Sequence, residues 1–258
     1  MPGILMRGLS HRRAGLACQD AGAIVVKNGV RIMALSDGCS ASKYATQAAY
    51  ANIKAILTMF CAVRLDVFLA LPELMQRIAV IGYAAREIAL TAGKIGDHHR
   101  RDYAATLIFS VQDAAGRTLL GHLGDGEIFA ARASGLPLYR SYPEPAAGGS
   151  TYFTVSPDAV EHLRLMTPDA VEKVLLTTDG AANGLPLAET PEMLQCLFSA
   201  VSDRELSERV RALGGDHTDD WGILTAAGAV SGSEVNVPRP DQQWEHLIRS
   251  IKEGMSDA

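Results

Sequence analysis

The chain has 258 residues, of which 48% are hydrophobic and 21% charged, a balance typical of a globular protein with a substantial buried core. Its net charge of −5 gives no reason to expect nonspecific nucleic-acid binding, and no window reaches the roughly 18 uninterrupted apolar residues of a membrane span. The four cysteines are scattered without a C-x-x-C pair, and the first residues lack a secretory signal. We therefore expect a cytoplasmic protein with reduced thiols and with neither nucleic acid nor membrane as a partner.

The first predicted elements are two strands, at residues 23–27 and 30–35, joined by Asn28-Gly29. Asn-Gly between two runs rich in β-formers is typical of a tight hairpin, because both residues tolerate positive φ. The two strands are therefore expected to be antiparallel, and the second one ends just before Asp37.

Two helices are predicted next. The first carries apolar residues at helical spacing from 45 to 57, and Ser40 or Ser42 is expected to cap its start. The second begins near Pro72, and Gly93 is expected to end it. We expect these helices to form an antiparallel pair that covers one face of a sheet.

The remaining chain predicts strands at residues 103–112, 117–123, 127–131, 152–155, 172–178 and 221–226, and helices at residues 191–200 and 203–213. Residues 141–150, rich in Pro and Gly, are expected to form a mobile loop, and residues 181–190 to be irregular. Strands and helices do not alternate as in a doubly wound fold, so the order indicates an α+β sandwich of antiparallel sheets with helix pairs outside. Residues 1–228 would form one domain, and residues 229–258 a C-terminal tail with a short amphipathic helix.

Acidic residues stand at the ends of four of these strands. Three strands end in the pairs Asp37-Gly38, Asp125-Gly126 and Asp179-Gly180, and Asp219-Asp220 precedes the last strand. Taken alone, each Asp-Gly pair favours a hairpin turn, and Asp125-Gly126 is the most turn-like. As an ordered set, carboxylates held at strand ends by a rigid sheet predict a site for a cluster of hard divalent cations.

With these motifs in order, the sequence resembles the metal-dependent protein phosphatases of the protein phosphatase 2C family, of the bacterial type. The motifs that carry the resemblance span residues 8–226 and are Ser10-His11-Arg12-Arg13, Cys18-Gln19-Asp20, Ser36-Asp37-Gly38, Ala105-Thr106-Leu107, Leu123-Gly124-Asp125-Gly126, Thr178-Asp179-Gly180 and Asp219-Asp220-Trp221-Gly222. The resemblance implies a four-layer α-β-β-α sandwich, two antiparallel sheets flanked by helix pairs, with residues 1–228 as the catalytic domain.

The resemblance also implies a set of metal ligands. Asp37 would bridge two Mg²⁺ or Mn²⁺ ions, and the Gly38 carbonyl would be an additional oxygen ligand. Asp179 and Asp219 would complete the shell of the first ion. Asp20 would hold the second ion through water. Such all-oxygen shells suit both metals.

Further roles follow from the same resemblance. Asp125 would serve a third, weaker ion, and Arg12 or Arg13 would bind the substrate phosphate, because a guanidinium can contact two phosphate oxygens in parallel. The implied reaction is the hydrolysis of phosphoserine or phosphothreonine in a phosphorylated protein substrate by a metal-activated water. The catalytic residues would be Asp37, Asp179 and Asp219.

The sequence departs from the family pattern at two places. Cys39 stands where some relatives have a histidine proposed as general acid, so protonation of the leaving group has no assigned residue. The basic residues also lie further from Asp20 than in most relatives. These departures keep a second function open, a phosphatase-like regulator that binds phosphoproteins with little or no turnover. A third interpretation is an α+β scaffold whose Asp-Gly pairs are all turns. His122, in mid-strand, is expected to be a core histidine.

Overall fold

The computed structural model describes residues 1–134, 137–144, 151–185, 187, 190–213 and 218–239. Two antiparallel sheets lie face to face, one of five strands in the order β1-β10-β9-β6-β7 and one of six in the order β11-β2-β3-β4-β5-β8. The strands are β1 (Gly3–Met6), β2 (Ala21–Lys27), β3 (Val30–Ser36), β4 (Leu107–Asp113), β5 (Thr118–Leu123), β6 (Glu127–Ala131), β7 (Pro137–Ser141), β8 (Arg164–Met166), β9 (Lys173–Thr177), β10 (Trp221–Ala227) and β11 (Glu234–Asn236).

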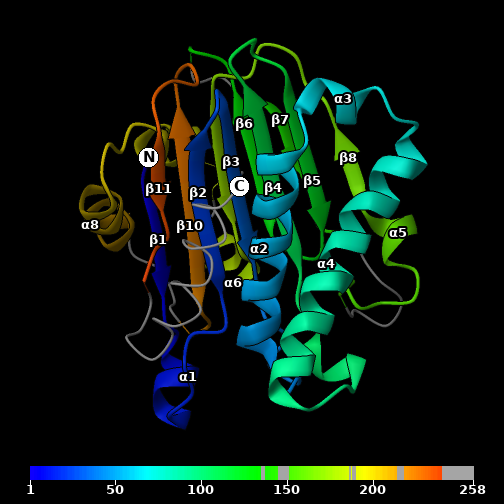
Figure 1. The fold of residues 1–258 in the computed structure, drawn as a ribbon. Helices are drawn as coiled ribbons and strands as arrows, with labels where there is room; N and C mark the ends of the chain where they lie inside the picture. The colour runs from blue at the N-terminus through cyan, green and yellow to red at the C-terminus, as the bar shows by residue number, and fades with distance from the viewer. Residues whose placement is uncertain (135–136, 145–150, 186, 188–189, 214–217, 240–258) are drawn as a thin grey trace.

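The helices flank the two sheets. They are α1 (Leu9–Ala14), α2 (Ala45–Ala62), α3 (Leu65–Leu69), α4 (Glu73–Ile95), the 3₁₀ helix η1 (Arg100–Tyr103), α5 (Ala159–His162), α6 (Asp179–Gly184), α7 (Pro191–Phe198) and α8 (Asp203–Leu213). Figure 1 shows α2 and α4 side by side over the six-stranded sheet and α8 at the opposite side of the molecule. None of the helices in the described ranges is both long and apolar enough to cross a membrane.

Strand β3 shows how the layers are built. Its side chains alternate between two cores, as a period of two residues requires. Ile32 and Ala34 pack in the cluster that includes α2 and α4, whereas Met33 and Leu35 pack between the two sheets. A third cluster joins α7 and α8 to the outer face of the five-stranded sheet. The predicted four-layer sandwich of two antiparallel sheets and flanking helix pairs is therefore confirmed.

The predicted hairpin is also confirmed. Strands β2 and β3 pair antiparallel from Lys27↔Val30 to Ala21↔Ser36. Both turn residues have positive φ, 51° at Asn28 and 73° at Gly29, which is the geometry that Asn-Gly favours. The hairpin carries the chain directly to Asp37.

Several local predictions are wrong. Ser40 and Ser42 do not cap α2, whose N-cap position is Tyr44, because the Ser42 hydroxyl instead donates to the Arg101 carbonyl at 3.1 Å. Gly93 lies within α4, and the helix ends at Gly96, which adopts the left-handed conformation at φ 80°.

Residues 152–155 form no strand. A local turn uses their hydrogen-bonding groups instead, since the Phe153 N–H donates to the Ser156 hydroxyl at 3.0 Å and the Ser156 N–H donates to the Phe153 carbonyl at 2.9 Å. Residues 181–184, predicted to be irregular, belong to α6.

The start and end of the described chain hold elements that the sequence did not predict. Strand β1 pairs with β10, and β11 pairs with β2 although it lies in the stretch expected to be a tail. The amphipathic helix predicted within residues 229–258, at Trp244 to Ile251, lies outside the described residues.

A buried asparagine on α2 fixes the strand end that precedes Asp37. The Asn52 side chain is fully buried, its amide donates to the Thr106 carbonyl at 3.1 Å, and its oxygen accepts from the Thr154 hydroxyl at 3.0 Å. Thr106 in turn binds Asp37 twice, since its N–H donates to the Asp37 carbonyl at 2.8 Å and its hydroxyl accepts from the Asp37 N–H at 2.9 Å. Asn52 thus supports the backbone position of Asp37.

We predict that Asn52→Leu lowers the free energy of unfolding by about 2 kcal/mol, because it removes partners from buried polar groups while it keeps the branched skeleton of the side chain. Thermal or urea unfolding measures the change. Gln47→Leu, at a half-buried position of the same helix, is the control and should stay within about 0.5 kcal/mol of the parent. Equal stabilities of the two variants would contradict the role of Asn52.

Candidate metal centre

The acidic positions predicted from the sequence lie at one end of the sandwich. Antiparallel pairing sets this arrangement, because a strand that ends there lies beside a strand that begins there. The end of β3 pairs with the start of β2 (Ser36↔Ala21), and the end of β9 pairs with the starts of β6 and β10 (Thr177↔Glu127 and Thr177↔Ile223). The segments that carry Asp20, Asp37, Asp125, Asp179 and Asp219 therefore meet.

Three of these carboxylates form one group. Asp37, Asp125 and Asp179 each offer an oxygen, and these oxygens all lie within 4.8 Å of one another. All three residues are half-buried. Asp20 is buried beside them, and its Oδ2 accepts a hydrogen bond of 2.8 Å from the Thr178 hydroxyl.

The acidic cluster raises the pKa values of its own members. Burial and then the charges of Asp125 and Asp219 raise the pKa of Asp179 to about 6. Burial, Asp20 and Asp179 hold the pKa of Asp37 well above its usual value, and burial and Asp220 do the same for Asp20. Carboxylates this close oppose one another's ionisation unless cations compensate their charge.

The chemistry of the site fits divalent metal ions. Among the described residues, Asp20 Oδ1 and Asp125 Oδ1 are buried without a hydrogen-bond partner, which is costly for a carboxylate oxygen unless a cation binds it. The available ligands are carboxylate oxygens, and hard ions such as Mg²⁺ and Mn²⁺ prefer oxygen.

Asp219 lies at the margin of the cluster. Its charge contributes to the raised pKa of Asp179, but it is not part of the group whose oxygens lie within 4.8 Å of one another. Its Oδ1 accepts a hydrogen bond of 2.8 Å from the N–H of Asp220. The structure thus brings Asp219 near the other carboxylates with its side chain turned to its own backbone.

Three segments of the chain approach one another closely at Gly38. A Cβ at this position would lie 2.7 Å from the carbonyl group of Ala45 and 2.9 Å from the Gln19 carbonyl oxygen. The absence of a side chain lets the first turn of α2 and the segment before Asp20 approach the end of β3. Gly38 also forms a bridge with Ala105.

The two predicted phosphate ligands lie on α1. Arg12 and Arg13 are exposed in its last turn, at the same end of the sandwich as the carboxylates. Neither forms an ion pair with another residue of the described ranges. Their guanidinium groups are therefore available to a ligand.

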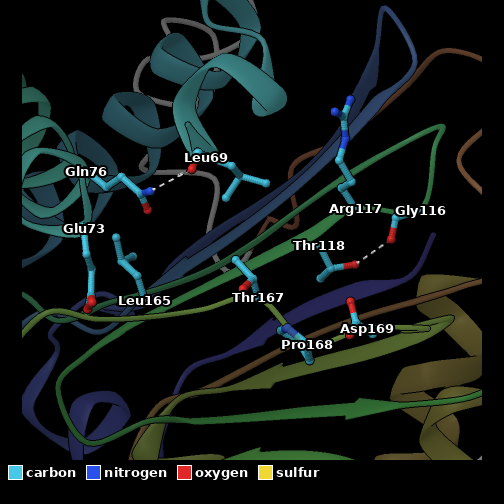
Figure 2. Close-up of a pocket in the computed structure, with 10 residues that line it drawn as sticks. All are labelled: Leu69, Glu73, Gln76, Gly116, Arg117, Thr118, Leu165, Thr167, Pro168 and Asp169. Atoms are coloured by element: carbon cyan, nitrogen blue, oxygen red, sulfur yellow. Dashed lines mark hydrogen bonds between the residues drawn. The ribbon is translucent and has the colours of Figure 1, made fainter. Parts of the chain in front are cut away.

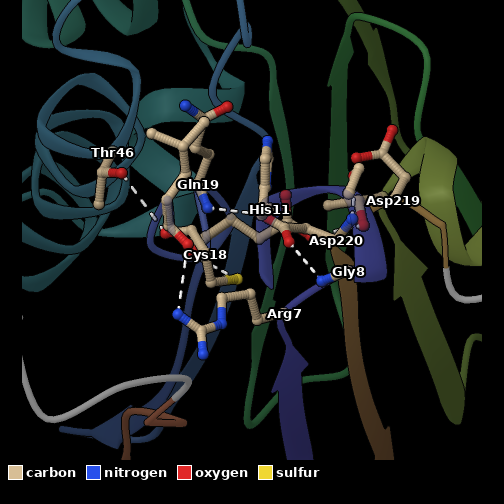
Figure 3. Close-up of polar contacts among 12 residues, drawn as sticks. Arg7, Gly8, His11, Cys18, Gln19, Thr46, Asp219 and Asp220 are labelled. Atoms are coloured by element: carbon tan, nitrogen blue, oxygen red, sulfur yellow. Dashed lines mark hydrogen bonds and ion pairs between the residues drawn. The ribbon is translucent and has the colours of Figure 1, made fainter. Parts of the chain in front are cut away.

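Two residues beside the predicted ligands, His11 and Asp220, were given no role by the sequence analysis. Figure 3 shows the Asp220 carboxylate between Gly8 and His11, with Asp219 next to it. The Asp219-Asp220 doublet was a signal for one acidic ligand, but nothing in the sequence indicated which residues the second carboxylate binds. Their contacts come from segments about 200 residues apart.

His122 is a core histidine, as expected. It is fully buried, its Nε2 lies 3.2 Å from the Gly124 carbonyl oxygen, and its Nδ1 contacts the Ser141 hydroxyl and Arg164. Burial, followed by the charge of Arg164, lowers the pKa of His122 to about 3. Its nitrogens are used within the core.

A cavity of about 410 Å³ lies at the other end of the sandwich (Figure 2). It is lined by residues of α3, α4, the β4–β5 turn and the segment after β8, including Arg117 and Asp169. The turn lies next to Val30, at the start of β3, whereas Asp37 follows the end of that strand. None of the predicted metal ligands lines this cavity.

A family model described as Protein phosphatase 2C matches residues 7–213. The chain belongs to the protein phosphatase 2C family. A comparison with curated protein sequences gave no match. The matched range holds Asp20, Asp37, Asp125 and Asp179, whereas Asp219 follows it.

Solved structures share the fold of this phosphatase 2C family member. The Mycobacterium tuberculosis serine/threonine phosphatase PstP/Ppp has a TM-score of 0.60 at 18% identity, covering 88% of this chain and 97% of that one. RsbX in complex with magnesium has a TM-score of 0.53 at 15% identity, with 89% and 94% covered. The photosystem II phosphatase PBCP has a TM-score of 0.59 at 13% identity, with 89% and 98% covered. At these identities the likeness is one of fold.

The raised pKa of Asp179 predicts how the metal-free protein responds to pH. Because folding raises this pKa from 3.8 to about 6, the folded state binds the proton more tightly than the unfolded chain does. The resulting stabilisation is present in acid and is lost as the pH rises through about 6. At pH above this range the ionised cluster destabilises the fold.

We therefore predict that Asp179→Asn, with chelator present, raises the free energy of unfolding above pH 7 by on the order of 2 kcal/mol and has little effect near pH 4. Thermal unfolding across this pH range measures the effect. Asp169→Asn, at an exposed carboxylate remote from the cluster, is the control and should change little at either pH. A lower stability of Asp179→Asn above pH 7 would contradict the electrostatic account.

Proposed function

We propose that the protein hydrolyses phosphoserine and phosphothreonine in phosphorylated proteins, using two Mg²⁺ or Mn²⁺ ions and, with Asp125, a third, weaker one. The observation that carries this proposal is the convergence of Asp37, Asp125 and Asp179, whose oxygens lie within 4.8 Å of one another at the strand ends of a phosphatase 2C sandwich. A magnesium complex of RsbX, which shares the fold, supports the choice of metal.

In this proposal the acidic residues hold the ions in fixed positions. Asp37 is central, because its carboxyl interacts with both Asp20 and Asp179. Asp37, Asp179, Asp219 and the Gly38 carbonyl would bind the first ion, and Asp37 with Asp20 the second. When bound, the ions would lower the pKa of the attacking water and neutralise charge on the phosphoryl oxygens.

Hydrogen bonds around the cluster orient these side chains before substrate arrives. The Thr178 hydroxyl donates to Asp20 and accepts from the Gly222 N–H, each at 2.8 Å. Both Asp37 backbone groups are bound to Thr106. Because these ligands are already held in position, their reorganisation during the reaction costs little free energy.

Arg13 or Arg12 would bind the substrate phosphate. A guanidinium presents two parallel N–H groups to phosphate oxygens and remains charged at any physiological pH. Both residues are exposed on α1, at the same end of the sandwich as the acidic cluster, which leaves them accessible to a phosphorylated side chain of another protein. We propose a cytoplasmic setting, in which such proteins are the substrates.

A second candidate function is a phosphatase-like regulator that binds phosphoproteins without turnover. Two features favour it: Cys39 follows the metal-binding pair where some relatives have a histidine, and the Asp219 side chain is turned toward its own backbone. Calorimetric Mn²⁺ binding with no release of phosphate from any phosphopeptide would establish the regulator. Measurable turnover would eliminate it.

We predict that the purified protein hydrolyses an aryl phosphate only with Mn²⁺ or Mg²⁺ present, and that Asp37→Asn or Asp179→Asn each lowers kcat/KM by about 1000-fold through loss of ion binding. Phosphate release measures the activity, and chelator should abolish it. Asp169→Asn is the matched control and should retain full activity. Unchanged activity in both cluster variants would remove the assigned centre.

A second prediction separates the two arginines. Replacing the phosphate-binding residue by alanine should raise KM for aryl phosphate by about 10–100-fold, the range expected for a lost charge-assisted hydrogen bond, and should weaken inhibition by inorganic phosphate equally. We expect the larger effect for Arg13→Ala than for Arg12→Ala. Arg204→Ala, at a side chain 89% exposed on α8, is the control. Wild-type KM in the Arg12/Arg13 double variant would exclude α1 from phosphate binding.

A further inference from the structure

The Asp220 carboxylate collects three hydrogen-bond donors from one distant segment. Oδ1 accepts from the Gly8 N–H at 2.6 Å, and Oδ2 accepts from the Gln19 N–H at 2.6 Å. Oδ2 also lies 2.8 Å from Nδ1 of His11. Asp220 is only 2% exposed, so protein groups take the place of water around its charge (Figure 3).

The same segment makes a close backbone contact with the start of β10. A Cβ at Gly8 would lie 2.3 Å from the Asp219 carbonyl carbon, so only glycine allows this approach. The Ser10 N–H donates to the Thr218 carbonyl at 3.0 Å. Residues 8–19 are thus joined to residues 218–220 by backbone and side-chain contacts.

These contacts join residues with different proposed roles. Asp219 precedes Asp220 directly, and Asp20 follows Gln19 directly. His11 precedes the two arginines of α1. One buried carboxylate therefore sets the relative positions of ligands for both ions and of the phosphate-binding side chains.

The donors around Asp220 require a carboxylate at this position, because both of its oxygens must accept a hydrogen bond. Each oxygen faces a backbone N–H at 2.6 Å. An asparagine would place its NH₂ group against one of these donors in either orientation of its amide. Because a carboxylate only accepts hydrogen bonds when ionised, the facing Nδ1 of His11 carries the proton.

His11 and Asp220 are buried together, close to the carboxyl of Asp20. Asp220 contributes to the raised pKa of Asp20, which shows that the two carboxyls repel each other. The His11 side chain is largely buried against Asp220, and the described residues provide no Lys or Arg ion pair to this carboxylate. Nδ1 of His11 lies 2.8 Å from Asp220 Oδ2, and the Cys18 thiol also interacts with this carboxylate.

We propose that His11 and Asp220 are a positioning pair, which holds residues 8–20 against the start of β10 and so sets the spacing between the metal ligands Asp20 and Asp219 and the phosphate-binding arginines. Neither residue contacts the substrate in this role. The pair's role presupposes the metal-dependent phosphatase activity proposed above, but its effect on metal affinity is measurable without turnover.

The test uses the full chain with two disruptive variants and one conservative variant. His11→Leu removes the donor, and Asp220→Asn retains the shape but sets its NH₂ group against one of the two backbone donors. We expect each to raise KM for an aryl phosphate and the Mn²⁺ dissociation constant by about 10–100-fold, as loss of groups that orient metal ligands does. His11→Asn, whose amide N–H can replace Nδ1–H, should recover most of both constants.

Three further measurements separate positioning from a general loss of stability. Thermal unfolding establishes that each variant is folded, and calorimetry gives the Mn²⁺ affinity without catalysis. Hydrogen exchange measures the protection of the Gly8 and Gln19 amides, which should exchange faster in Asp220→Asn than in the wild type. Ser10→Ala, which removes a neighbouring and exposed hydrogen bond to the Thr218 carbonyl, is the matched control and should keep wild-type constants.

Folded His11→Leu and Asp220→Asn proteins with wild-type KM and Mn²⁺ affinity would overturn the proposal, even if their melting temperatures fall. The same conclusion would follow if His11→Asn were as impaired as His11→Leu. Absence of phosphatase activity in the wild type would refute the proposed function alone, because Mn²⁺ affinity and hydrogen exchange still report on the pair. If His11→Leu does not fold, Asp220→Asn and His11→Asn decide the outcome.

Discussion

The two sheets hold together, at one end of the sandwich, several carboxylates that repel one another. Asp20, Asp37 and Asp179 have raised pKa values because they are buried beside one another. Free side chains would separate or remain protonated, but these are attached to strand ends whose positions the two sheets fix. The fold thus maintains a concentration of negative charge that divalent cations can neutralise.

The rigidity of this arrangement comes from burial on both faces of the central strands. Ile32 and Ala34 pack under the helices, and Met33 and Leu35 pack against the second sheet, so β3 cannot shift without disturbing two cores. Asn52 and Thr106 then transmit this fixed position to the Asp37 backbone. Polar groups near the acidic cluster accordingly orient its side chains, and apolar packing holds the strands.

The sequence predicts the parts of this site that depend on local patterns. Asn28-Gly29 defines the β2–β3 hairpin because both residues tolerate positive φ, and the acidic residues at strand ends are visible as motifs in order.

Local patterns fail to predict the structure where a residue can be accommodated in more than one way. Ser42 could cap α2 but instead binds the Arg101 carbonyl, and Gly93 resembles a helix terminator although Gly96 is the residue with positive φ. The partners of Asp220 had no local signal, since its three donors lie in residues 8–19 and only tertiary folding brings them near.

The pairing of the first strand with the last strand of the five-stranded sheet has a consequence for biosynthesis. Strand β1 pairs with β10, and Asp219 and Asp220 directly precede that late strand. During translation the early segment that carries His11 and Asp20 must wait for about 200 further residues before its partners emerge. A nascent or prematurely terminated chain that lacks β10 has no complete acidic centre, so this end of the sandwich can form only after β10 has been synthesised.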